Sequence, residues 1–131
     1  MGKFSFRKEE RLSREKHIQE LFDKGSSFYL FPFKVLFMPN SDPAVLHHQI
    51  LISVSKRVFK RAVDRNLIKR RMREAYRLQK EFLPAGTPLQ IGYIYTHKEI
   101  LLFDEMKRRM FLSFKKLPKP STQITDTITP W

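Results

Sequence analysis

The sequence contains no cysteine, only four glycines and no long apolar run. Without cysteine the chain has no disulfide-linked partner, no thiolate metal ligand and no cysteine nucleophile. The glycines are isolated from one another, which excludes a glycine-rich phosphate loop. The apolar runs are far shorter than the roughly 20 residues of a membrane span, so we expect no membrane partner. Residues 1–16 lack a secretory signal, and we therefore expect a cytoplasmic protein.

Acidic residues are scarce where a metal-dependent nuclease would need them. The predicted strand cores at 33–38, 48–55 and 89–96 contain no Asp or Glu, whereas such enzymes hold divalent ions with clustered carboxylates. His47 and His48 are adjacent, so in a strand they would point to opposite faces. We expect no catalytic residue, and no metal site formed by the chain itself.

Positive charge is the abundant feature, because 26 Lys or Arg oppose 13 Asp or Glu, a formal net charge of +13. Such an excess repels itself in a compact chain unless a polyanion lies nearby. Residues 56–80 alone hold eleven Lys or Arg and two acids, a net charge of +9. Since 41% of the chain is hydrophobic, we expect a folded domain rather than a basic tail. The composition favours a protein that binds nucleic acid.

The apolar periodicity predicts an α/β sandwich (α+β) with elements in the order α-β-β-α-β-α around one small mixed sheet. Ser13 is predicted to cap the first helix, and Gly25 to end it in a left-handed conformation. Strands are predicted at 28–38, 48–55 and 89–96, the last two parallel, with a bend or edge position at Pro32.

The remaining predictions concern the later helices and the domain limits. Residues 84–86 are predicted to close the helix that precedes the third strand. A last helix, opening at Asp104, is predicted to bury four apolar side chains: Met106, Met110, Phe114 and Leu117. We expect a basic extended N-terminus at 1–12, a single RNA-binding domain at 13–117 and a flexible tail at 118–131.

A helical wheel over residues 62–82 separates an apolar side from a cationic side. The apolar side is predicted to comprise Ile68, Met72, Ala75, Tyr76, Gln79 and Phe82. The cationic side is predicted to comprise Arg65, Asn66, Lys69, Arg70, Arg73, Arg77 and Lys80. A charged helix face is often simply solvated, but such faces usually alternate in sign, and this one has almost no acid. Binding to phosphates would relieve the repulsion between its cations.

The same residues resemble a known family. The segment SVSKR at 53–57 and the pattern RNxxKRxxR, matched by Arg65, Asn66, Lys69, Arg70 and Arg73, are similar to the bacterial ribonuclease P protein family. Residues 11–25 are similar to its amino-terminal helix. The resemblance implies a left-handed β-α-β crossover, which is an exception to the usual hand.

The resemblance also implies partners and sites. The expected partners are the catalytic RNA of ribonuclease P and precursor tRNA, whose 5′ leader is removed by the RNA; magnesium (Mg2+) would be held mainly by that RNA. The implied RNA-subunit contacts are Lys56, Arg57, Lys60, Arg61, Arg65, Asn66, Lys69, Arg70, Arg73 and Arg77. The implied leader-binding cleft comprises Ile18, Phe22, Lys34 and Leu36, with Phe37 as the alternative to Leu36.

Three other functions fit parts of the sequence. A ribosomal-type RNA-binding protein or RNA chaperone would share its size, charge and lack of catalytic groups. An autonomous nuclease is disfavoured by the missing carboxylates, and a membrane-surface helix by the small apolar side of residues 62–82. Because exposed cations contribute little to folding, Arg65→Ala and Arg73→Ala are expected to weaken RNA binding with little loss of stability.

Overall fold

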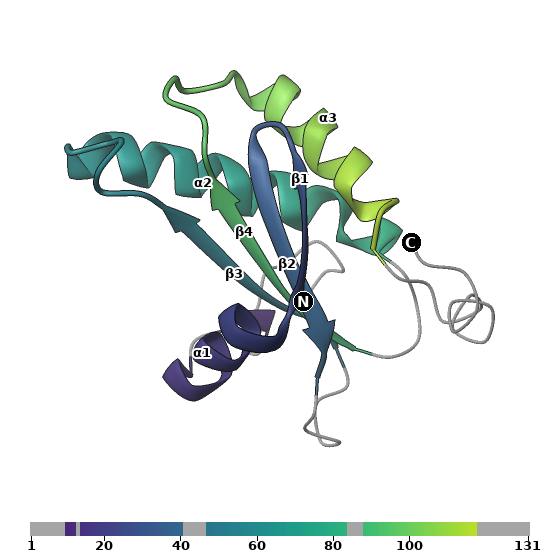
Figure 1. Ribbon diagram of the computed structural model, residues 1–131. Coiled ribbons are helices and arrows are strands. Elements are labelled where there is room, and N and C mark those ends of the chain that lie inside the picture. The colour runs from purple at the N-terminus through teal and green to yellow at the C-terminus, as the bar shows by residue number, and fades with distance from the viewer. Residues whose placement is uncertain (1–9, 13, 41–46, 84–87, 118–131) are drawn as a thin grey trace.

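The structure, a computed structural model, describes residues 10–12, 14–40, 47–83 and 88–117. It is an α+β fold in which three helices surround one mixed sheet of four strands, as Figure 1 shows. In chain order the elements are α1 (Glu15–Lys24), β1 (Ser26–Leu30), β2 (Phe33–Pro39), β3 (Gln49–Val54), α2 (Ala62–Gln79), the short 3₁₀ helix η2 (Lys80–Phe82), β4 (Leu89–Tyr95) and α3 (Phe103–Phe114). The predicted fold class is confirmed.

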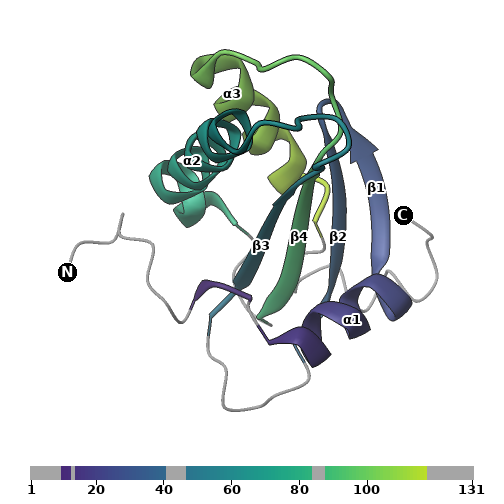
Figure 2. The same cartoon turned by 90° about the vertical axis from the view of Figure 1, so that its left-hand side faces the viewer.

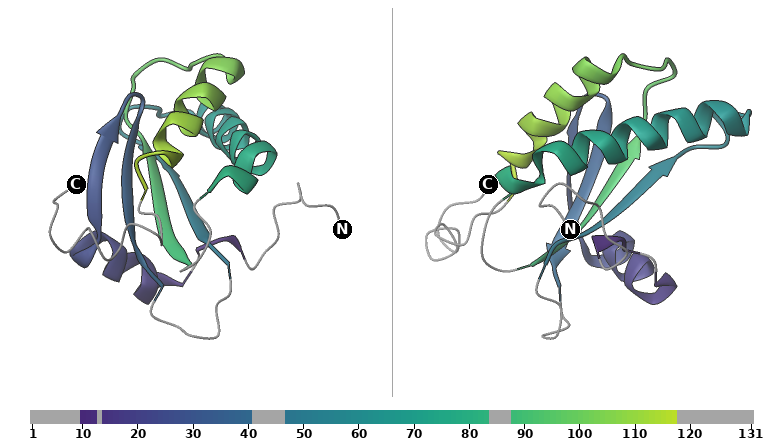
Figure 3. Two further views of the ribbon diagram at one scale, coloured as in Figure 1. Left: turned by 90° about the vertical axis from the view of Figure 1, so that its right-hand side faces the viewer. Right: turned by 180° about the vertical axis from the view of Figure 1, so that it is seen from behind.

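The strands lie in the order β1-β2-β4-β3, with β3 and β4 parallel and the other two pairs antiparallel. In Figure 1, β3 and β4 both point upward, β4 lies to the right of β3, and α2 passes behind the sheet. The view from behind in Figure 3 places α2 in front of the strands, in agreement. The connection β3–α2–β4 is therefore a left-handed crossover, as the resemblance implied.

The segment predicted as one strand over 28–38 is instead a hairpin. Strands β1 and β2 pair from Ser26↔Phe37 to Leu30↔Phe33, and the chain reverses at Phe31-Pro32. Proline has no N–H to donate to a strand ladder, so the chain turns there and the two halves pair with each other. The sheet consequently has four strands rather than three.

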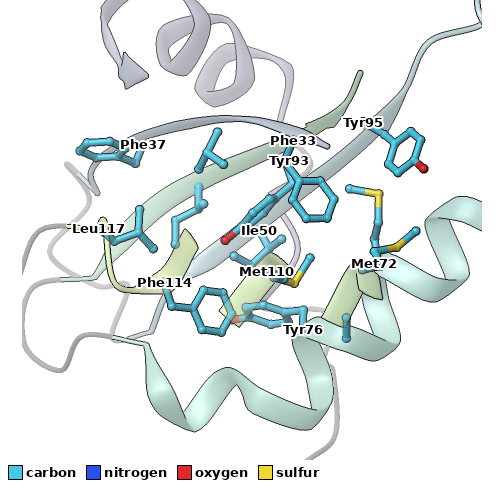
Figure 4. Packing of buried hydrophobic residues seen from close by; sticks show 14 of the residues in the cluster. Phe33, Phe37, Ile50, Met72, Tyr76, Tyr93, Tyr95, Met110, Phe114 and Leu117 are labelled. Carbon is cyan, nitrogen blue, oxygen red and sulfur yellow. The ribbon is translucent and has the colours of Figure 1, made fainter. Parts of the chain in front are cut away.

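The main core lies between the sheet and the layer of α2 and α3, which Figure 2 shows on the opposite side of the sheet from α1. Figure 4 shows its aromatic and methionine side chains meeting between the strands and helix α2. As predicted, α3 and the turn after it bury Met106, Met110, Phe114 and Leu117. A smaller cluster of Leu12, Leu21 and Leu36 lies on the α1 side.

Helix α1 ends at Gly25, but not in the predicted way. Gly25 is extended, with φ −70° and ψ 152°, rather than left-handed. Its N–H donates to the Leu21 carbonyl at 2.9 Å, and a Cβ at this position would lie 2.4 Å from that oxygen. The glycine is required by close approach, because the chain passes directly into β1. The N-cap is Arg14, which makes no side-chain capping bond, and the predicted cap Ser13 lies outside the described residues.

The segment before α1 is attached to strand β3, at the edge of the sheet opposite β1. The Leu12 N–H donates to the Ile50 carbonyl at 2.8 Å, and Arg11 forms a parallel bridge with Ile50 at the outer edge of β3. Glu10 is almost buried and forms an ion pair with Lys80, with 2.8 Å between Nζ and Oε1. Residues 10–12 therefore join the end of α2 to the start of β3.

Some predictions fall beyond the described residues, namely the turn at 84–86 and the tail at 118–131. The limits predicted for the domain are likewise untested. Within the described ranges, no helix has both the length and the apolar character needed to cross a membrane.

Candidate nucleic-acid interface

Helix α2 is fixed to the core by one side. The predicted apolar residues Ile68, Met72, Ala75 and Tyr76 are all buried, and the Gln79 amide donates to the Lys107 carbonyl of α3 at 2.8 Å. Phe82 was wrongly assigned to this side. The α-helix ends at Gln79, and in the following 3₁₀ turn the Phe82 side chain is 59% exposed.

The opposite side of α2 carries unneutralised cations. Asn66, Arg70 and Arg73 are exposed, and Lys69 is half-buried. Within the described part of the chain, none of their side chains makes a hydrogen bond or an ion pair. Because the buried side fixes the rotation of the helix, these groups form a surface of defined geometry that faces solvent.

Arg65 has a different role from its neighbours. Its guanidinium donates to the carbonyls of Phe59 and Lys60, at 2.8 Å and 2.9 Å. Phe59 is buried, with its ring 6.0 Å from that of Tyr95. Arg65 thus ties the loop at 55–61 to α2. The expectation that Arg65→Ala causes little loss of stability does not fit this geometry, since the guanidinium makes two hydrogen bonds to the loop.

The loop presents the remaining predicted contacts. Lys56, Arg57, Lys60 and Arg61 are all exposed around the buried Phe59. Arg61 lies 3.8 Å from the Asp64 carboxylate, a loose and exposed pair. The loop and the first turns of α2 therefore form one continuous cationic surface.

The end of the predicted cationic side is partly neutralised. Arg77 binds Glu74, with 3.0 Å between Nε and Oε1. This hydrogen bond holds the pKa of Glu74 below its usual value and raises the pKa of Arg77. Lys80, predicted on the same side, is instead turned toward Glu10. We name the free part the basic surface: Lys56, Arg57, Lys60, Asn66, Lys69, Arg70 and Arg73.

The predicted leader residues lie on the α1 side of the molecule. Lys34 is exposed on the α1 face of the sheet, and Phe22 on α1 is 46% exposed. Ile18 is half-buried. Leu36 also faces α1, but it is only 5% exposed because it packs with Leu21. The alternative, Phe37, belongs to the main core on the other face.

Sequence reasoning missed the cross-strand neighbours of Lys34. The register pairs Lys34 with Tyr29 on β1 and with Ile94 on β4, and Ile94 with Ser53 on β3. The prediction of one strand over residues 28–38 did not place Tyr29 beside Lys34. Placing a turn at Pro32 would have paired Tyr29 with Lys34, because Phe28 and Tyr29 then lie on opposite faces of β1.

A metal-binding cluster is not assembled in the described ranges. No three His, Asp or Glu side chains there lie close enough together to hold a metal ion. His48 accepts a hydrogen bond from the Leu89 N–H at 2.9 Å through Nδ1, while His47 is exposed.

Comparison with known proteins identifies the family. The family model described as ribonuclease P matches residues 6–117, which include both faces described above. The chain belongs to the ribonuclease P protein family.

The curated relatives agree with this assignment. The ribonuclease P protein component of Porphyromonas gingivalis strain W83 is 41% identical over 80 residues, which cover 61% of this chain and 58% of the relative. The match thus spans somewhat less than two thirds of that relative. The protein component of Chlorobium phaeobacteroides is 36% identical, over 95% of this chain and 88% of the relative.

Solved structures of ribonuclease P proteins share the fold. The Thermotoga maritima protein superposes with a TM-score of 0.70 and 26% identity, covering 83% of this chain and 98% of the other. The Staphylococcus aureus protein gives a TM-score of 0.68 and 25% identity, covering 82% and 94%. The four-stranded sheet and its crossover are therefore those of the ribonuclease P protein family.

Proposed function

We propose that this chain is the protein subunit of ribonuclease P. It binds the catalytic RNA through the basic surface and the 5′ leader of precursor tRNA through the α1 face of the sheet. The RNA cuts the substrate to leave the mature 5′ end, and magnesium ions are held mainly by the RNA. The observation that carries the proposal is the basic surface itself: free cations on a helix whose other side is fixed in the core.

The chemistry of the basic surface suits folded RNA. Arg70 and Arg73 offer planar guanidinium groups that can bind phosphate through two hydrogen bonds and stack on bases. Their mutual repulsion is relieved when phosphates replace the counterions around them. Since these side chains are engaged with no other described residue, RNA binding does not require an internal ion pair to be broken first.

The two faces are connected through β3. This strand carries Ser53 on the α1 face and leads directly into the loop that contains Lys56 and Arg57. An RNA strand lying on the α1 face can therefore continue onto the basic surface without crossing the core. This continuity supports one protein contacting both the catalytic RNA and the adjacent leader.

Reconstitution with the catalytic RNA tests the proposal. The wild-type protein should strengthen binding of precursor tRNA far more than binding of mature tRNA. Arg73→Ala should weaken assembly with the RNA, whereas the matched control Arg108→Ala, an exposed arginine paired with Glu105 on α3, should not. The protein without RNA should leave precursor tRNA uncut when magnesium is present.

Two outcomes would contradict the proposal. Equal strengthening of precursor and mature tRNA would favour a ribosomal-type RNA-binding protein or an RNA chaperone. Cleavage by the RNA-free protein would identify an autonomous nuclease.

A further inference from the structure

A row of side chains crosses the α1 face of the sheet beyond helix α1. The strand register places Tyr29, Lys34, Ile94 and Ser53 side by side on β1, β2, β4 and β3. Since neighbouring strands lie about 4.8 Å apart, the row spans roughly 14 Å. It contains one cation, no acid, and an aromatic ring at the end that is most distant from the basic surface.

Tyr29 differs from the other tyrosines of the chain. Tyr76, Tyr93 and Tyr95 are buried in the main core, whereas Tyr29 is 59% exposed. No other ring and no cation among the described residues contacts the Tyr29 ring. The strand is anchored instead by Phe28, which packs on the core from the opposite face. Packing of the core thus gives no reason for an aromatic residue at position 29.

The pairing of Tyr29 with Lys34 suits a single-stranded nucleic acid. An exposed ring can stack on any unpaired base, and a neighbouring ammonium group can contact the phosphate beside it. A duplex offers no free base face, so the pair would distinguish an unpaired strand from the folded tRNA body. On the facing helix, Phe22 supplies a second exposed ring.

We propose that Tyr29 is a specificity-determining residue that stacks on an unpaired base of the leader. This inference rests on the proposed function. Because the row begins at Ser53, next to the basic surface, Tyr29 lies about 14 Å along it and contacts a nucleotide distant from the cleavage site. A leader of one nucleotide is too short to reach it.

The test compares three substrates bound to the reconstituted holoenzyme: precursor tRNA with a long leader, precursor tRNA with a one-nucleotide leader, and mature tRNA. Tyr29→Ala should weaken binding of the long-leader precursor about fivefold or more, with no change for the other two. Tyr29→Phe should retain wild-type affinity because it retains the ring. Tyr29→Leu, which keeps apolar bulk without a flat ring, should behave like Tyr29→Ala.

The matched control is Phe82→Ala, which removes a ring of equal exposure from the turn after α2 and should change none of the three affinities. If Tyr29→Ala fails to fold, the affinities of Tyr29→Leu and Tyr29→Phe for the long-leader precursor are compared instead. Unchanged long-leader binding by Tyr29→Leu, or equal loss on mature tRNA, would overturn the role of Tyr29. If the wild-type protein itself fails to favour the long leader, the proposed function fails instead.

Discussion

The attachment of the 55–61 loop by Arg65 makes a prediction that separates folding from RNA binding. In Arg65→Ala, two carbonyl acceptors lose a charged donor, at Phe59 and Lys60. Hydrogen bonds to charged groups contribute about 1.5–3 kcal/mol each when protected from water. Here Arg65 is only half-buried and the Lys60 bond is exposed, so we expect the free energy of unfolding to fall by about 1–2 kcal/mol.

Urea unfolding followed by circular dichroism measures this loss, with Arg73→Ala as the matched control. Arg73 is exposed and engaged with no described residue, so its removal should change the free energy of unfolding by no more than about 0.5 kcal/mol. Both variants should bind RNA more weakly.

Hydrogen exchange locates the effect of Arg65→Ala. The Phe59 N–H donates to the Ser55 carbonyl at 3.0 Å, and this amide should exchange faster once the loop is released. If Arg65→Ala is as stable as Arg73→Ala and the Phe59 amide keeps its protection, Arg65 does not hold the loop and the reasoning is wrong.

Three further predictions concern charge, close packing and pH. Arg73→Ala should reduce the log–log salt dependence of RNA affinity by about 0.7–0.9, one phosphate contact, in a salt titration; an unchanged slope would remove Arg73 from the interface. Gly25→Ala should lower the free energy of unfolding by about 1–3 kcal/mol, measured by urea denaturation, because its Cβ would meet the Leu21 carbonyl at 2.4 Å; wild-type stability would refute this. Burial raises the pKa of Tyr93 above its ordinary value, so the folded state holds this proton more tightly than the unfolded state. Stability should therefore be intact below about pH 10 and fall as the pH rises further. Urea titrations at several alkaline pH values should show a smaller fall for Tyr93→Phe, and an equal fall would count against the assignment.

Features with a regular period were predictable from the sequence. The buried side of α2 followed from helical spacing, and the alternation of Ile50 and Leu51 between the two faces of β3 followed from the strand period. The hairpin was missed because residues 28–38 are apolar or aromatic on both sides of Pro32, apart from Lys34, and Pro32 was interpreted as a bend or edge position within one strand. Phe82 was misplaced because the wheel assumed a helix that continues beyond Gln79.

Contacts between distant parts of the chain were not predictable in this way. A helical wheel places Lys80 and Arg65 among the cations, but it contains no information on Glu10, 70 residues away, or on the carbonyls of a loop. Which cations remain free to bind RNA depends on these tertiary partners. The sequence motif therefore predicted the position of the proposed interface, and only the fold distinguishes its free cations from those that support the structure.

The attachment of residues 10–12 beside β3 has a consequence for self-association. An outermost strand offers open backbone N–H and C=O groups that can pair with another molecule. Here the Leu12 N–H already donates a hydrogen bond to the Ile50 carbonyl. The ion pair between Glu10 and Lys80 holds residues 10–12 in place. At the other margin of the sheet, β1 is only five residues long. Neither margin thus presents a long uninterrupted template, which disfavours edge-to-edge aggregation of the isolated protein.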